Sequence, residues 1–416
     1  MGLDTFCLIT GMHHFESRQT ILEHLWPSKS RIVRAIAGGS KSQPTSEEDL
    51  AKIQHGLFLS RRDVKSSSLM VMIAPEGDPT DLQNAKPNPI CAPYLRWMFP
   101  EAPKQINETN TKVIPNVRVW NDLSYDQYHD ADHRRDEYAS EYPYKPQSGS
   151  GAAVNYAAYV ILRHACPRLL PHVLFIIYHQ CKEPDGCWYY LPPEIDYGPV
   201  QKVIAQWPEY NNLGWGGADD PNGKPWDQIL FQKKSADEIL ADAWGGRGAL
   251  WVTVRPNKFP IQETMDAVSQ IFFTPDASQD KKPNFLERLP LELVGEICSH
   301  LTPDEISPLL GLSKPLRKRL EPYIHTCIYR YIKDEAPWYL PAGPIVFEDP
   351  RFGGEEIDAW TTGWSNVGIK EEDIEALVPW MTYLRECGFS LSMRNRKRIW
   401  GISKQLEALA IERGLI

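Results

Sequence analysis

The chain has 416 residues, of which 42% are hydrophobic and 24% charged, a composition typical of a folded globular protein. This length exceeds what one hydrophobic core usually serves, so two or more packed units are expected. The formal net charge of -9 argues against nucleic acid as a partner, because phosphate binding depends on clustered Lys and Arg side chains. No apolar run approaches the ~20 residues of a membrane-spanning helix, so no membrane partner is expected.

The first residues contain no basic segment followed by a sustained apolar stretch, so no secretory signal is predicted. The eight cysteines are scattered along the chain, and the absence of close, regular spacing favours reduced thiols over a disulfide framework. Both features predict a protein of the cytoplasm, the nucleus or both.

The N-terminal region alternates apolar segments with long polar loops. Strands are predicted where β-branched and aromatic residues concentrate, at Phe6–Thr10, Leu69–Ile73, Val113–Trp120 and Leu250–Val254. Apolar residues at helical spacing predict helices at Ser17–Leu25 and Ala152–His164. These elements predict a mixed α and β domain over residues 1–274, and therefore an α+β fold class for the chain.

A solvated linker is predicted at residues 275–284. Together with Thr274 this stretch reads TPDASQDKKPN, with two prolines, four charges and no large apolar residue. Beyond it the pattern is helical up to Asp334. A loop rich in Pro and Gly follows, and residues 326–416 end in two helical segments, the last from Ser392 to about Arg413.

Residues 285–325 carry the pattern of three short amphipathic helices. Apolar residues recur every four positions, at Leu289, Leu293, Ile297 and Leu301, and therefore share one helix face. Pro290 suits the first turn of the first helix. The cap, Pro and Glu of residues 302–305 begin a second helix, and the Ser, Lys and Pro of residues 313–315 begin a third. Three such helices cannot bury all their apolar surface against one another, so the remainder packs on the same chain or on a partner.

The identities of these residues resemble the F-box, a helical module that binds a Skp-type adaptor, which in turn binds a cullin ubiquitin ligase. The similarity covers about a tenth of the chain. Carried over position by position, it implies that nine residues contact the adaptor or hold the helices for it: Leu289, Pro290, Glu292, Leu293, Ile297, Leu301, Ile306, Leu309 and Leu316. Two positions depart from the family pattern, namely Pro308 inside the second helix and Leu316 where a bulkier aromatic residue is common.

An F-box in the C-terminal third, behind a long N-terminal domain, is similar to an arrangement frequent in filamentous-fungal proteins. The tail segments Tyr383–Cys387 and Ser392–Trp400 resemble endings of that group. The opening residues 6–11 are similar to its Cys-containing starts, although Thr10 stands where a second Cys is frequent.

The resemblance implies a non-catalytic substrate adaptor, with residues 1–274 holding an unknown protein substrate. Such an adaptor acts by proximity and needs no cofactor, metal or catalytic residue of its own. Two alternatives remain open. The chain could act as an F-box interaction protein outside a cullin complex, or it could be an enzyme, metal-dependent or other, whose site lies around His129–His133.

Two further groups of residues are assigned to structure rather than to function. The first comprises His164, Cys166, His172, His179, Cys181 and Cys187. It lacks the paired spacing of structural zinc ligands, which favours core thiols and histidines. The second is the basic run from Arg394 to Arg398, for which a solvated helix face is expected ahead of an acidic partner.

Overall fold

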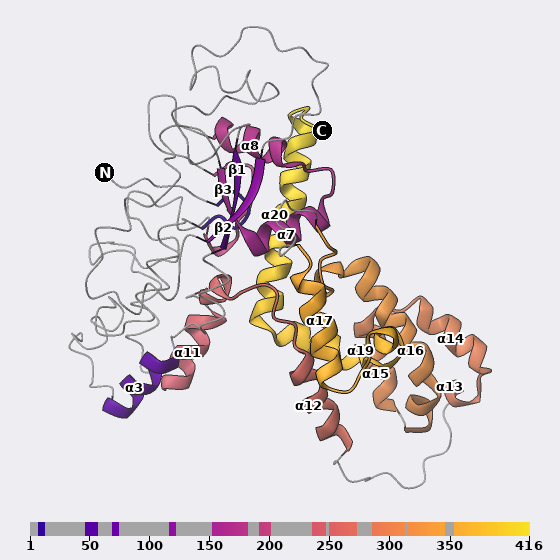
Figure 1. Ribbon diagram of the computed structural model, residues 1–416. Helices are drawn as coiled ribbons and strands as arrows, with labels where there is room; N and C mark the ends of the chain where they lie inside the picture. Colours follow the sequence, from indigo (N-terminus) through magenta and orange to yellow (C-terminus); the bar gives the residue numbers. More distant parts are fainter. Residues whose placement is uncertain are drawn as a thin grey trace, which may run out of the picture. The chain divides into compact units, whose positions relative to one another are not determined.

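The computed structural model describes residues 7–12, 46–56, 69–74, 116–121, 152–181, 191–200, 235–246, 249–272, 285–312, 314–345 and 353–416. The chain divides into two compact units (Figure 1). The first comprises Met1–Pro256, Ile345–Gly353 and Arg398–Ile416, and the second comprises Asn257–Pro344 and Gly354–Lys397.

The expected α+β fold class is wrong, because helices make up 70% of the interpretable part of the chain and strands contribute little. Three short strands form an antiparallel ladder in the order β2-β1-β3. Strand β1 is Leu69–Ala74, β2 is Asn116–Asn121 and β3 is Ala152–Asn155. The predictions of strands near β1 and β2 are confirmed, within the residues that the structure describes.

Two other predicted strands are not strands. Residues 7–12 form a turn in which the Gly11 N–H donates to the Cys7 carbonyl at 2.8 Å. Residues Leu250–Thr253 form the 3-10 helix η2. The apolar side chains of both segments are buried, so their β-branched content reflects burial and not pairing in a sheet.

The described part of the first unit centres on helices that pack beside the ladder (Figure 1). Helix α7, Tyr156–Ala165, follows directly on β3, and α8 is Pro171–Gln180. The helix predicted from Ala152 begins only at Tyr156. The four preceding residues, 152–155, form β3 and pair with β1. The Asn155 side chain then caps α7 by accepting the Ala158 N–H at 3.1 Å.

The C-terminal helix α20, Leu391–Glu412, supplies its later turns to the first unit. Lys404 Nζ donates to the Ala165 carbonyl at 2.6 Å, and Arg413 Nη1 donates to Gln180 Oε1 at 2.7 Å. Both contacts hold α20 beside α7 and α8. The prediction of a last helix from Ser392 to about Arg413 is confirmed.

A pair of helices, α3 at Glu47–Gly56 and α11 at Ala236–Trp244, also belongs to the first unit. Trp244 Nε1 donates to the Gly56 carbonyl at 2.7 Å, where it satisfies a carbonyl at the end of α3. Lys52 Nζ lies 2.7 Å from Asp237 Oδ2 across the pair.

The described part of the second unit is helical. Its elements in chain order are α12 (Ile261–Phe272), α13 (Phe285–Arg288), α14 (Leu291–Ser299), α15 (Pro303–Leu312), α16 (Lys314–Glu335), η3 (Pro337–Tyr339), α17 (Glu355–Asn366), η4 (Glu371–Asp373), α18 (Ile374–Leu377), α19 (Trp380–Phe389) and the start of α20. The three helices predicted within residues 285–325 are confirmed as α14, α15 and α16. The third continues well beyond Leu320, to Glu335.

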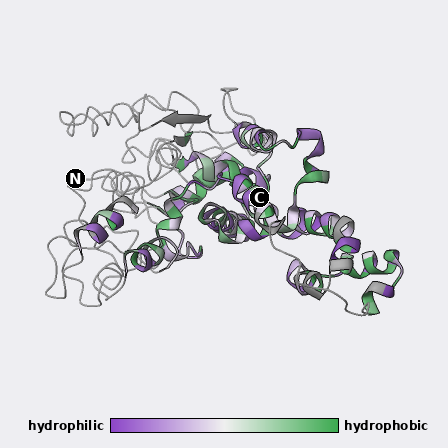
Figure 2. Cartoon of the chain, turned by 90° about the horizontal axis from the view of Figure 1, so that it is seen from below, coloured by the Kyte–Doolittle hydropathy of each residue, from purple (hydrophilic) through white to green (hydrophobic). Residues whose placement is uncertain are grey.

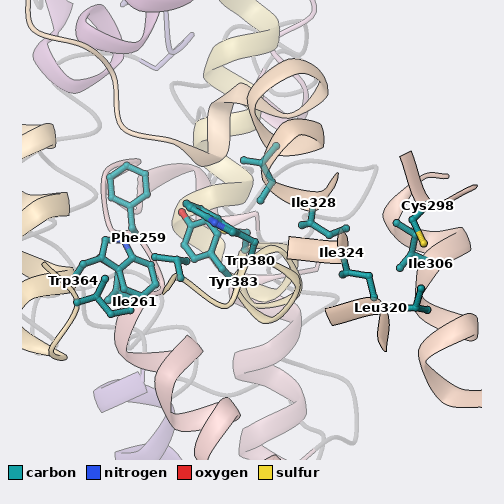
Figure 3. Close-up of a cluster of buried hydrophobic side chains, with 14 of the residues drawn as sticks. Phe259, Ile261, Cys298, Ile306, Leu320, Ile324, Ile328, Trp364, Trp380 and Tyr383 are labelled. Carbon is teal, nitrogen blue, oxygen red and sulfur yellow. The ribbon is translucent and has the colours of Figure 1, made fainter. Parts of the chain in front are cut away.

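The helices carry both hydrophobic and hydrophilic residues (Figure 2), and many apolar side chains of the second unit are buried in one cluster. Figure 3 shows Cys298, Ile306 and Leu320 at one end of this cluster and Phe259, Ile261 and Trp364 at the other, with Ile324, Ile328, Trp380 and Tyr383 between them. Several of its aromatic rings meet edge to face, as for Trp360 and Tyr383, whose centroids are 5.5 Å apart, whereas Trp360 and Trp380 stack. One continuous core therefore supports α14, α15 and α16.

Several predictions fall outside the described residues. These are the helix Ser17–Leu25, the acidic and histidine-rich segment His129–His133, and the linker at residues 275–284. Among the helices that the structure describes, none combines the length and the apolar character needed to cross a membrane.

Candidate partner-binding surface

Helix α14 exposes apolar side chains although it packs on a hydrophobic core. It begins after Pro290, whose carbonyl accepts the Val294 N–H at 3.2 Å. Val294 and Cys298 are buried in the core, whereas Leu293 is 53% exposed and Ile297 is 40% exposed. Leu293 and Ile297 lie four positions apart and therefore share one face of the helix, which we call the Leu293–Ile297 face.

The close approach of α14 to α16 sets which side of α14 is buried. Gly295 lies against Tyr323, and a Cβ atom at position 295 would stand 2.5 Å from both Cδ1 and Cε1 of that ring. Arg319 Nη2 also donates to the Leu289 carbonyl at 2.8 Å, just before α14 begins. The glycine lets the tyrosine ring reach the α14 backbone, and this contact leaves the Leu293–Ile297 face uncovered in the described part of the chain.

Helix α15 is positioned by a cap at its start. Both the N–H and the hydroxyl of Thr302 donate to Glu305 Oε2, each at 2.8 Å. The Thr302 N–H, followed by its hydroxyl, lowers the pKa of the Glu305 carboxyl. Pro308 lies inside α15 without ending it, since the helix continues to Leu312. Ile306 is fully buried and anchors α15 in the core.

The nine residues implied by the F-box resemblance fall into three groups by exposure. The exposed ones are Pro290, Glu292, Leu293 and Ile297; the partly buried ones are Leu289, Leu301 and Leu309; the buried ones are Ile306 and Leu316. The side chains of the exposed group are the ones that a partner can reach most readily. Ile306 and Leu316 act from inside the unit by holding α15 and α16 in place.

Phe285 in α13 is 74% exposed and was not among the nine residues. It precedes Leu289 by four positions, so it continues the same spacing toward the N-terminus. Leu289 and Pro290 separate α13 from α14, however, so this spacing does not place Phe285 on the Leu293–Ile297 face.

The basic run at the start of α20 is only partly solvated. Arg394 and Lys397 are exposed, as expected, whereas Arg398 is partly buried and Arg396 is buried, so the expectation is wrong for these two residues. Arg396 is buried in an ion pair with Glu356. Lys397 Nζ lies 5.3 Å from the centroid of the Trp338 ring. Arg398 Nη1 donates to the Thr10 carbonyl at 2.8 Å, and burial lowers the pKa of its guanidinium to about 10.

The cysteines near residue 170 behave as core thiols. Cys166 Sγ contacts the Ser403 carbonyl at 3.4 Å and Cys181 Sγ contacts the Ile177 carbonyl at 3.2 Å. Burial raises the pKa of each thiol to about 12, which disfavours the reactive thiolate. His164, by contrast, is exposed beside Trp400, so its assignment to the core was wrong. Within the described ranges, no three His, Cys, Asp or Glu side chains gather where they could hold a metal ion.

Comparisons of the chain with protein-family models, with curated proteins and with solved structures find no match.

Proposed function

We propose that this chain is the substrate-recognition adaptor of a cullin ubiquitin ligase and that it docks a Skp-type adaptor through α14, α15 and α16. The observation that carries the proposal is the exposure of Leu293 and Ile297 at positions that the F-box resemblance assigns to adaptor contact. Three consecutive helices over the segment that carries the resemblance support the proposal, although the third extends beyond that segment to Glu335.

Energetics support a partner at the Leu293–Ile297 face. Full burial of an aliphatic side chain stabilises a protein or a complex by ~1.5–3 kcal/mol. Leu293 and Ile297 are only partly buried in the free chain, so a partner that covers them would supply the rest of this stabilisation. Exposed apolar groups that cluster on a soluble protein commonly mark interaction sites. The core beneath α14 supplies the rigid support that a docking helix needs.

In this proposal the ligase chemistry belongs to the partners. The chain contributes proximity, since it holds a protein substrate near the charged ubiquitin and so raises the effective concentration of a substrate lysine. The substrate contacts then lie outside α14–α16, with residues 1–274 as the first region to examine.

The decisive experiment replaces the two exposed side chains with polar ones. In the full-length chain, Leu293→Ser with Ile297→Ser should weaken binding to a purified Skp-type adaptor by roughly thirtyfold or more, because central apolar anchors at interfaces commonly contribute ~2 kcal/mol or more. Both side chains are already partly in water, so the fold should persist. Titration calorimetry would give the affinities.

The chain offers a matched control. Leu377 and Phe389 are 58% and 76% exposed in the same unit, but they lie on α18 and α19. Leu377→Ser with Phe389→Ser should leave adaptor binding unchanged. Equal binding by wild type and the Leu293/Ile297 variant would show that this face is not the docking site.

A second measurement separates ligase assembly from adaptor binding alone. The tagged chain should recover a cullin together with the Skp-type adaptor from cells. Recovery of the adaptor without a cullin would instead favour an F-box protein that acts outside the ligase.

A further inference from the structure

Of the three helices that carry the proposed docking surface, α14 and α15 contain acidic residues but neither Lys nor Arg, whereas α16 contains several Lys and Arg residues. Helix α14 reads LELVGEICS and α15 reads PDEISPLLGL. Glu292 and Glu296 of α14 are both exposed, and each directly precedes a residue of the Leu293–Ile297 face. Four positions separate the two glutamates, so their carboxylates form a row along one edge of that face.

Local structure accounts for Glu305 of α15 and for Glu292 better than for Glu296. Glu305 accepts two hydrogen bonds from Thr302 at the cap of α15. Glu292 lies in the first turn of α14, where the helix dipole favours an anion. Glu296 lies in the middle of α14, and its carboxylate contacts His300 Nε2 at 3.1 Å on the open surface.

The row carries a small cost for the free chain, because like charges four residues apart destabilise a helix. The nearest basic side chains in sequence belong to other elements. Arg288 ends α13, while Arg317 and Lys318 are exposed in α16. Arg319 is engaged with the Leu289 carbonyl. The edge of the Leu293–Ile297 face on α14 is therefore anionic.

We propose that the partner which covers Leu293 and Ile297 presents Lys or Arg side chains to Glu292 and Glu296, so that charge steers the docking. This inference rests on the proposed function and specifies the chemistry of its partner surface. Complementary charge at an interface rim raises the association rate more than it slows dissociation. Salt screens such exposed charges, so the effect should weaken as ionic strength rises.

The test measures association rates of the full-length chain with a purified Skp-type adaptor by stopped-flow fluorescence. Glu292→Lys with Glu296→Lys should slow association roughly tenfold or more at low ionic strength. The neutral variant, Glu292→Gln with Glu296→Gln, should associate at an intermediate rate. Because this variant has no like-charge repulsion within α14, a slower rate in it cannot be attributed to a destabilised helix. Both differences should shrink at high ionic strength.

Glu371→Lys with Glu372→Lys is the matched control, because it makes the same change in net charge at exposed positions of η4. It should leave the association rate unchanged. If both reversals slow binding equally, the effect comes from net charge and the inference is overturned.

The two proposals fail in different ways. If the wild-type chain binds the adaptor but the Glu292/Glu296 reversal associates at an unchanged or higher rate, the docking stands and the basic partner edge is refuted. If the wild-type chain shows no binding, the proposed function fails and this inference falls with it.

Discussion

Arg396 and Glu356 form a bidentate ion pair in the interior of the second unit. Arg396 Nη1 lies 2.9 Å from Glu356 Oε1, and Nη2 lies 2.9 Å from Oε2. Their side chains are 0% and 7% exposed. Glu356 Oε2 also accepts the Ala342 N–H at 2.8 Å, and Arg396 Nη2 donates to the Leu340 carbonyl at 2.9 Å. The pair therefore fastens the segment after η3 to α17 and to the start of α20.

Glu356→Gln should lower the free energy of unfolding by ~3–5 kcal/mol, because it leaves the Arg396 charge buried without its counter-ion. Urea denaturation followed by tryptophan fluorescence would report this, since Trp360 and Trp364 lie on the same helix as Glu356. Glu372→Gln is the control. Glu372 pairs with Lys370 at 4.0 Å on the surface, where such pairs contribute ~1 kcal/mol or less. Similar losses from both substitutions would contradict a special role for the buried pair.

Gly295→Ala should destabilise the second unit. The new methyl group would overlap the Tyr323 ring, and overpacking of this kind typically costs ~1–3 kcal/mol. Alanine is favoured over glycine within a helix by ~1 kcal/mol, so the net loss should be smaller than the packing cost. If α14 moves outward, adaptor binding should weaken as well.

Gly388→Ala is the matched control for this prediction, since nothing lies within 4 Å of an added Cβ in α19. There the helix propensity acts alone, and thermal unfolding should show unchanged or slightly increased stability. A Gly295→Ala protein that is as stable as the Gly388→Ala protein would show that Tyr323 can move aside at no cost.

The Glu305 carboxylate should stabilise α15 in a pH-dependent way. Its hydrogen bonds with Thr302 lower its pKa in the folded chain. A group with a lowered folded pKa contributes stability above its ordinary pKa and loses it as the pH falls through the folded value. Glu305→Gln should therefore be less stable than wild type at neutral pH, and the difference should vanish in acid. Urea midpoints across that range would show it, whereas a constant difference would argue against the cap.

The helices around residues 285–325 could be predicted because their signals are local. Pro290 and the cap at Thr302 lie within a few residues of the helix starts that they define. The fold class of the N-terminal region could not be predicted in this way. At Leu250–Thr253 the β-branched residues are buried in a short 3-10 helix, and composition does not distinguish a buried helix from a buried strand.

The exposed part of the docking surface could be predicted only in outline. Spacing predicts one face for Leu289, Leu293 and Ile297, but Leu289 lies before α14 begins, and spacing does not say which side chains the rest of the chain covers. That depends on Tyr323, which reaches the α14 backbone at Gly295 from 28 positions further along the chain. The burial of Arg396 within the basic run could not be predicted for the same reason, since its partner Glu356 lies in α17.

A fragment that spans residues 257–397 should be more stable than one that spans residues 275–397. Helix α12 contributes Ile261 to the core cluster, and Phe259 precedes it there. Both lie before the linker predicted at residues 275–284. Phe259 packs edge to face on Trp360 with centroids 5.0 Å apart. The shorter fragment lacks both side chains, so its free energy of unfolding should be lower by several kcal/mol, at ~1.5–3 kcal/mol for each buried side chain.

Both fragments end at Lys397 because the later turns of α20 bury Ile399, Ile402 and Leu406 in the first unit, and these side chains would otherwise be exposed. Circular dichroism during urea denaturation would compare the two fragments, and both retain Arg396 for its pairing with Glu356. If the longer fragment gains no stability, α12 is not part of the core that supports the docking helices. If it unfolds cooperatively at higher urea and still binds a Skp-type adaptor, the docking unit begins at Asn257, ahead of the linker.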